Sequence, residues 1–144
     1  MATENDLDEV IEQYRHSVGE FTKGNPEPQK ELWSHREDVI LANPLGPPAR
    51  GWEQVDQALE RAASTVRDGH IVDVETLAKY VTPELAYVVE IERVMAKLGA
   101  REDITPFALR VTTVFRLEEG TWRVVHRHAD PITTPQPAES VIQE

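Results

Sequence analysis

The spacing of apolar residues changes once along the chain, near Gly69, and this change limits the folds that the chain can adopt. Before Gly69, apolar residues recur every three or four positions, which is the period of amphipathic helices. After it, they alternate with polar residues, which is the period of half-buried strands. The pattern predicts helices over residues 7–21, 28–34 and 52–66, and strands over residues 38–42, 71–81, 85–98, 107–117 and 122–129. Helices followed by hairpins favour an α+β fold, with an antiparallel sheet packed on three N-terminal helices.

The length of the chain and of its strands adds two expectations. The chain has 144 residues, the size of one domain. Several predicted strands have ten or more residues, whereas strands in globular proteins usually have about five or six. A strongly curved sheet accommodates such long strands best. We therefore expect one domain over residues 7–131, a disordered N-terminus over residues 1–6 and a flexible tail over residues 132–144.

The charge of the chain excludes several classes of partner. Its formal net charge is −11, and a field of this sign repels phosphate groups and anionic lipids. We therefore expect neither a nucleic acid nor a membrane as a partner. The chain has no cysteine, so a disulfide framework and a thiol nucleophile are excluded. Its first residues lack the basic and apolar parts of a signal peptide, and we expect a cytoplasmic protein.

Two histidines near the end of the chain are candidate acid–base groups. His126 and His128 lie two residues apart on a predicted strand, so their side chains point to one face, which Trp122 and Val124 would share. Histidine titrates near neutral pH and could bind or protonate a ligand in a pocket. The alternatives are packing residues or a dimer face. A metal site would need a third ligand such as Glu92, and we expect no metal and no other cofactor.

Charged residues also alternate with apolar ones on the two predicted strands over residues 85–98 and 107–117. Glu92 shares its predicted face with valines, and Arg110 and Thr112 occupy one face of the next strand. If the two strands form a hairpin, Glu92 lies beside or diagonal to Arg110, as a buried ion pair in a pocket or as a solvated pair on the surface. We take Glu92, Arg110 and Thr112 as candidate ligand-binding residues.

Three large aromatic residues complete the candidate site. Tyr14, Trp33 and Trp52 lie on the predicted helices, from which their side chains could turn into a cavity. Core packing is the alternative for each of them.

The order of the elements and the end of the chain resemble a known superfamily. In its most specific part, Trp122 opens the last strand and Val125-His126-Arg127-His128 leads to its end. This pattern resembles the SnoaL-like domains of the nuclear-transport-factor-2-like superfamily, which includes ketosteroid isomerase, polyketide cyclases and the association domain of calmodulin-dependent kinase II. The resemblance implies a cone-shaped curved sheet around a pocket, and a homodimer through the sheet.

The chain departs from ketosteroid isomerase at the residues that carry its chemistry. Tyr14 stands where the resemblance places the tyrosine of the oxyanion hole. Asn43 replaces the aspartate base, and Thr113 replaces the second acid; neither can perform that role. Ketosteroid isomerisation is therefore not expected.

The resemblance implies a small hydrophobic or acidic ligand. The function we expect is that of a small-molecule-binding protein, with isomerase, cyclase or hydratase activity on a carbonyl compound as one hypothesis. His126 or His128 would then be the acid–base group, and Arg110 would hold an anionic oxygen. The other hypothesis is a non-catalytic module for ligand sensing or oligomerisation.

Overall fold

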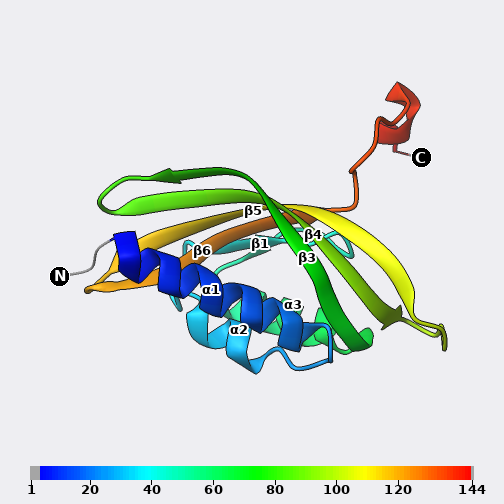
Figure 1. Cartoon of the computed structure of the whole chain (residues 1–144), viewed down its shortest axis with the longest axis horizontal. Coiled ribbons are helices and arrows are strands. Elements are labelled where there is room, and N and C mark those ends of the chain that lie inside the picture. The colour runs from blue at the N-terminus through cyan, green and yellow to red at the C-terminus, as the bar shows by residue number, and fades with distance from the viewer. Residues whose placement is uncertain (1–3, 144) are drawn as a thin grey trace.

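Three helices lie against one face of a six-stranded sheet in the computed structural model, which describes residues 4–143 (Figure 1). The elements, in chain order, are α1 Glu4–Phe21, α2 Glu27–Leu32, β1 Ile40–Ala42, β2 Ala49–Arg50, α3 Trp52–Ala63, β3 Val66–Val81, β4 Leu85–Leu98, β5 Thr105–Glu118, β6 Thr121–Asp130 and the 3₁₀ helix η1 Ala138–Val141. No helix within residues 4–143 is long and apolar enough to cross a membrane.

The sheet is mixed and does not close. Its strand order is β2-β1-β6-β5-β4-β3, and β1 runs parallel to β6 while all other neighbours are antiparallel. The long strands curve over the helices, so the sheet has an inner face against α1, α2 and α3 and an outer face away from them (Figure 1). The predicted α+β fold with a curved sheet on three N-terminal helices is confirmed.

Bulges in β3 account for much of the difference between the predicted and observed strands. The register with β4 shifts three times, between Arg67 and His70, between Ile71 and Asp73, and between Thr76 and Ala78. Each extra residue bends and twists the strand. These shifts interrupt the alternation of apolar and polar residues, which is the signal for a strand, and β3 begins at Val66, before the predicted start and shortly after α3 ends at Ala63. The two-residue strand β2 lies within the loop between β1 and α3 and was not predicted.

The core lies between α1 and the inner face of the sheet. Its largest fully buried side chains are Trp33, Tyr14 and Phe115. The rings of Tyr14 and Phe115 meet edge to face, with their centroids 5.9 Å apart. This contact is one of those that fix the position of α1 over β5.

The two predicted terminal segments have different outcomes in the described part of the chain. Residues 4–6, within the predicted disordered segment 1–6, already belong to α1, and residues 1–3 lie outside the described residues. After Asp130 the chain leaves the sheet and ends in the exposed turn η1 (Figure 1).

Gly69 marks a close approach between the end of α1 and the start of β3. Its N–H donates to the carbonyl oxygen of Thr22 at 3.1 Å. A Cβ atom added at Gly69 would lie 2.7 Å from that oxygen and 2.8 Å from the Cβ of Ala96. The two segments can pack at this distance only because residue 69 has no side chain.

We predict that Gly69→Ala lowers the free energy of unfolding by about 1–3 kcal/mol, because the added methyl group forces α1 away from the sheet. Gly46→Ala is the matched control, since a Cβ at Gly46 meets nothing within 4 Å. Urea unfolding of both variants measures the difference. Equal stability of the two variants would contradict this account of the packing.

Candidate functional site

A single extra residue in β6 decides which side chains of that strand face the helices. Val114 on β5 pairs with His126 and Phe115 pairs with Val124, so Val125 has no partner in the ladder and forms a bulge. Trp122 and Val124 point inward before the bulge. After it the alternation is shifted by one residue, and Arg127 is the residue that points inward, with only 5% of its surface exposed.

The predicted face of the two histidines is wrong for this reason. His126 and His128 do not share the inner face of Trp122 and Val124 but lie on the outer face of the sheet. The side chain of His128 is 56% exposed, and its Nε2 lies 3.2 Å from a carboxylate oxygen of Asp130. His126 is half-buried, and burial together with the nearby His128 lowers its pKa.

Arg127 forms a buried ion pair with Glu92 at the centre of the inner face. One terminal nitrogen, Nη1, donates to Glu92 Oε2 at 3.0 Å, and the other, Nη2, donates to Oε1 at 2.9 Å. Nη1 also donates to the hydroxyl oxygen of Tyr14 at 2.9 Å. The side chains of Arg127 and Glu92 are only 6% and 4% exposed. Three elements, β6, β4 and α1, therefore meet at one guanidinium group.

The surroundings hold the arginine charged and the tyrosine neutral. Burial acts to lower the pKa of Arg127, but the charge of Glu92 and the hydroxyl of Tyr14 outweigh it, so this pKa lies above its ordinary value. Burial raises the pKa of the Tyr14 hydroxyl, and the carboxylate of Glu92 adds to the rise, while Arg127 opposes it. Tyr14 therefore keeps its proton and remains a hydrogen-bond donor at neutral pH.

A cavity of about 260 Å³ opens beside this ion pair. Its wall is formed mainly by apolar side chains of α1, α3, β4 and β5, among them Val18, Phe21, Val94, Phe107 and Leu109. Residues 43–45 and Pro131 also contribute to the wall. The volume is slightly below the range of roughly 300–1,000 Å³ that is typical of ligand pockets.

Few polar groups reach this cavity. Glu92 and Arg127 are the only ionisable residues of its wall within the described part of the chain. Gln29 of α2 lines it too and is 3% exposed. Asn43, which stands where the resemblance to ketosteroid isomerase places a base, is also part of the wall.

A second buried carboxylate lies two residues from Glu92 on the same face. Glu90 accepts a hydrogen bond from Arg15 Nε at 3.1 Å and forms an ion pair with the same guanidinium group. Arg15 also donates to the hydroxyl of Thr76 at 3.0 Å. This cluster connects α1 with β3 and β4, and it does not line the apolar cavity.

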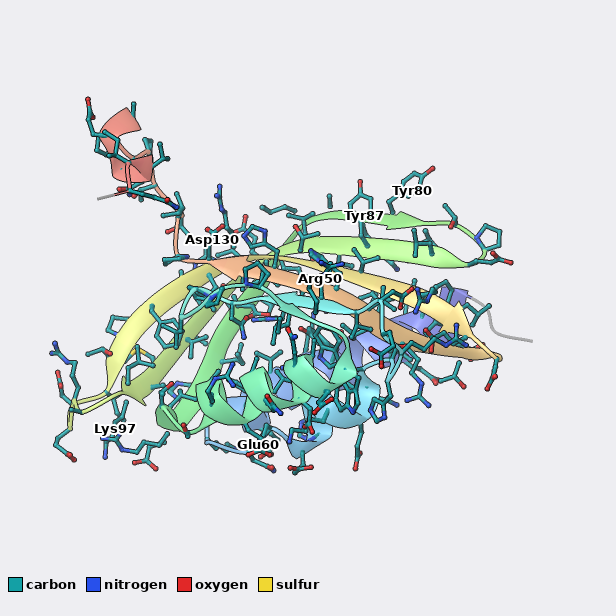
Figure 2. The ribbon with its side chains drawn as sticks, turned by 180° about the vertical axis from the view of Figure 1, so that it is seen from behind. Arg50, Glu60, Tyr80, Tyr87, Lys97 and Asp130 are labelled. Carbon is teal, nitrogen blue, oxygen red and sulfur yellow. The ribbon has the colours of Figure 1, made fainter. Side chains whose placement is uncertain are left out.

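The predicted pair of Glu92 and Arg110 is not formed. Glu92 stands opposite Leu109 in the ladder, so Arg110 points to the outer face. There its Nε lies 2.6 Å from Asp130 Oδ1 (Asp130 is labelled in Figure 2). Thr112 is opposite His128 on the same outer face. The partner of Glu92 is Arg127, which the sequence pattern did not indicate as a site residue.

Of the three aromatic candidates, Tyr14 contacts the ion pair and the two tryptophans do not. Trp33 is 1% exposed and belongs to the core, with its indole nitrogen unpartnered among the described residues. The half-buried ring of Trp52 stacks on His35, with centroids 3.9 Å apart. Neither tryptophan lines the apolar cavity.

The described residues contain no group of three or more histidine, aspartate or glutamate side chains placed to hold a metal ion. His126 and His128 lie on the outer face, whereas Glu92 is on the inner face, so these three cannot converge on one ion.

Comparison with known proteins places the chain in a family. The model of the SnoaL-like domain family matches residues 10–133, nearly the whole chain. No curated protein sequence matches it.

Solved structures with the same fold share little sequence with the chain. A nuclear-transport-factor-2-like superfamily protein from Salmonella enterica serovar Typhimurium has a TM-score of 0.75 and 18% identity, and the match covers 94% of each chain. A ketosteroid isomerase-like protein from Erwinia carotovora has a TM-score of 0.72 and 16% identity, over 88% of this chain and 94% of that one. A candidate dehydratase of the same superfamily from Streptomyces avermitilis has a TM-score of 0.69 and 18% identity, over 90% and 96%.

The buried ion pair leads to a prediction for stability. We expect Arg127→Met and Glu92→Met each to lower the free energy of unfolding by about 3–5 kcal/mol, because each leaves one uncompensated charge in an apolar interior. The double variant carries no unpaired charge, and we expect it to recover most of the loss. Urea unfolding of the four proteins measures this coupling. Losses that simply add in the double variant would contradict a direct buried pair.

Proposed function

The chain belongs to the SnoaL-like domain family, and we propose that its apolar cavity binds a small, mostly apolar organic molecule whose polar group lies against Arg127. The observation that carries this proposal is the guanidinium group itself. Its contacts with Glu92 and Tyr14 use three of the five N–H donors of an arginine, and the other two have no partner among residues 4–143. Buried donors are rarely left unpaired, and a ligand oxygen would satisfy them.

The chemistry that fits this site is acid–base chemistry on a carbonyl compound. Arg127 lines the cavity and is the donor that would polarise a carbonyl oxygen or stabilise an enolate, while Tyr14, which does not line it, holds the guanidinium group in place. Glu92 is the carboxylate that lines the cavity, whereas the amide of Asn43 cannot accept a proton at neutral pH. Isomerisation, cyclisation and hydration, the last with solvent water as the second reactant, belong to this class of reaction. The ketosteroid isomerase-like and dehydratase-like structural neighbours support this class of reaction.

Non-catalytic ligand sensing is the second candidate, favoured by Asn43 in place of a base. Turnover of a bound carbonyl compound that is lost on Glu92→Gln would decide for the enzyme. The histidines have no role inside the cavity in either case, because His126 and His128 lie on the other side of the sheet.

Filling the cavity tests the proposal without touching its polar groups. Ala62 of α3 lines the cavity, and we expect Ala62→Phe to weaken binding of the fluorescent ketone 2-acetylnaphthalene at least about tenfold by occupying its place. Ala100→Phe, in the exposed turn between β4 and β5, is the matched control and should bind like the unaltered protein. Titration followed by amide chemical shifts measures both. Unchanged binding by the Ala62 variant would place the ligand elsewhere.

We also propose that the chain forms a homodimer through the outer face of its sheet. The rings of Tyr80 and Tyr87 stack with centroids 5.8 Å apart, and both project from β3 and β4 away from the helices (Figure 2). They are 57% and 39% exposed, and Leu85 nearby is 49% exposed. Exposed apolar groups gathered on one face favour association.

We expect the double substitution Tyr80→Glu and Tyr87→Glu to convert a dimer into a monomer, because it places like charges on both copies of the interface. Val141→Glu is the control, since Val141 is 82% exposed on η1, away from the sheet. Light scattering coupled to size exclusion measures the mass. A monomeric unaltered protein, or a double variant that remains dimeric, would refute this interface.

A further inference from the structure

The apolar cavity carries no net charge, although it contains two charged groups. Glu92 and Arg127 are the only ionisable residues of its wall within residues 4–143, and they neutralise one another through two hydrogen bonds. The guanidinium group is therefore not a free cation that waits for an anion. Its charge is already balanced by the protein.

This balance determines which ligands the cavity can accept. A carboxylate placed beside Arg127 would also lie near the carboxylate of Glu92, and it would bring one uncompensated negative charge into an apolar space. An ammonium group would bring one uncompensated positive charge beside Arg127. An uncharged oxygen, in contrast, can accept the unused N–H donors of Arg127 without changing the balance.

The position of Gln29 is an independent observation that also favours an uncharged ligand. Its side chain is on the cavity wall, the residue is 3% exposed, and its amide makes no hydrogen bond with any described residue. An amide that lines a cavity and has no partner in the protein is free to form hydrogen bonds with a ligand there. It is both a donor and an acceptor, and it is uncharged, which suits a carbonyl or a hydroxyl group.

We propose that the cavity selects uncharged ligands that carry a carbonyl or hydroxyl oxygen, held by Arg127 and Gln29, and that Glu92 excludes carboxylates by neutralising Arg127. This inference rests on the proposed small-molecule function, and it narrows the expected hydrophobic or acidic ligand to a neutral one. Glu92 acts here as a specificity-determining residue through its charge.

Three probes with one skeleton test the preference in the unaltered protein. They are 2-acetylnaphthalene, which is neutral, 2-naphthoate, which is an anion, and 2-naphthylmethylammonium, which is a cation. We expect the ketone to bind at least about thirtyfold more tightly than either ion at pH 7.5 and fixed ionic strength. Tighter or equal binding of 2-naphthoate would overturn the inference and leave the proposed function standing. Failure of all three to bind at millimolar concentration would refute the proposed function itself.

The substitution Glu92→Gln tests the cause of the preference. It keeps the shape of the side chain and removes its charge, so the positive charge of Arg127 becomes uncompensated. We expect 2-naphthoate to bind at least about tenfold more tightly to this variant than to the unaltered protein. Glu90→Gln is the matched control, because Glu90 lies on the same strand face, is equally buried and pairs with Arg15 outside the cavity. An unchanged ranking of the probes in Glu92→Gln would overturn the role of Glu92.

A third variant keeps the test decisive if Glu92→Gln does not fold. Gln29→Leu removes only an uncharged amide, and we expect it to reduce the preference for 2-acetylnaphthalene over 2-ethylnaphthalene, which has no oxygen, at least about threefold. An unchanged preference would show that Gln29 does not hold the oxygen, and the proposed recognition would be wrong.

Discussion

The bidentate pair of Arg127 and Glu92 is the contact on which the interior of this domain depends. Two charged groups leave water only when each is satisfied by the other, so β6 and β4 must hold their registers within a fraction of an ångström. The bond from Arg127 to Tyr14 adds α1 to the same constraint. A sheet and a helix that could slide on a purely apolar interface are thereby limited to one relative position.

The bulge at Val125 is what brings the arginine to this place. Without the extra residue, strict alternation from Trp122 would direct His126 and His128 inward and Arg127 outward. One inserted residue thus places an arginine, instead of two histidines, on the inner face. The same bulge moves the histidines to the outer face, where Arg110 and Asp130 also lie.

The sequence predicted the fold well because helix and strand periods extend over many residues, and local irregularities shift them little. It also placed Glu92 on one strand face with valines, and β4 keeps this alternation because it has no bulge relative to β5. It failed where a single residue matters: the side of Arg127 depends on Val125, and the partner of Arg110 depends on the register of a hairpin. The two adjacent valines at 124 and 125 interrupt the alternation, and they were the available signal for the bulge.

The distribution of charge between the surface and the interior also has a consequence for ligands. The chain has a net charge of −11, yet both buried carboxylates of the inner face, Glu90 and Glu92, have an arginine partner. The acidic excess is therefore carried outside the core. An approaching anion would meet repulsion from the surface and then a cavity with no free positive charge, whereas an uncharged molecule would meet neither barrier. The surface field and the neutral interior thus favour the same class of ligand by independent means.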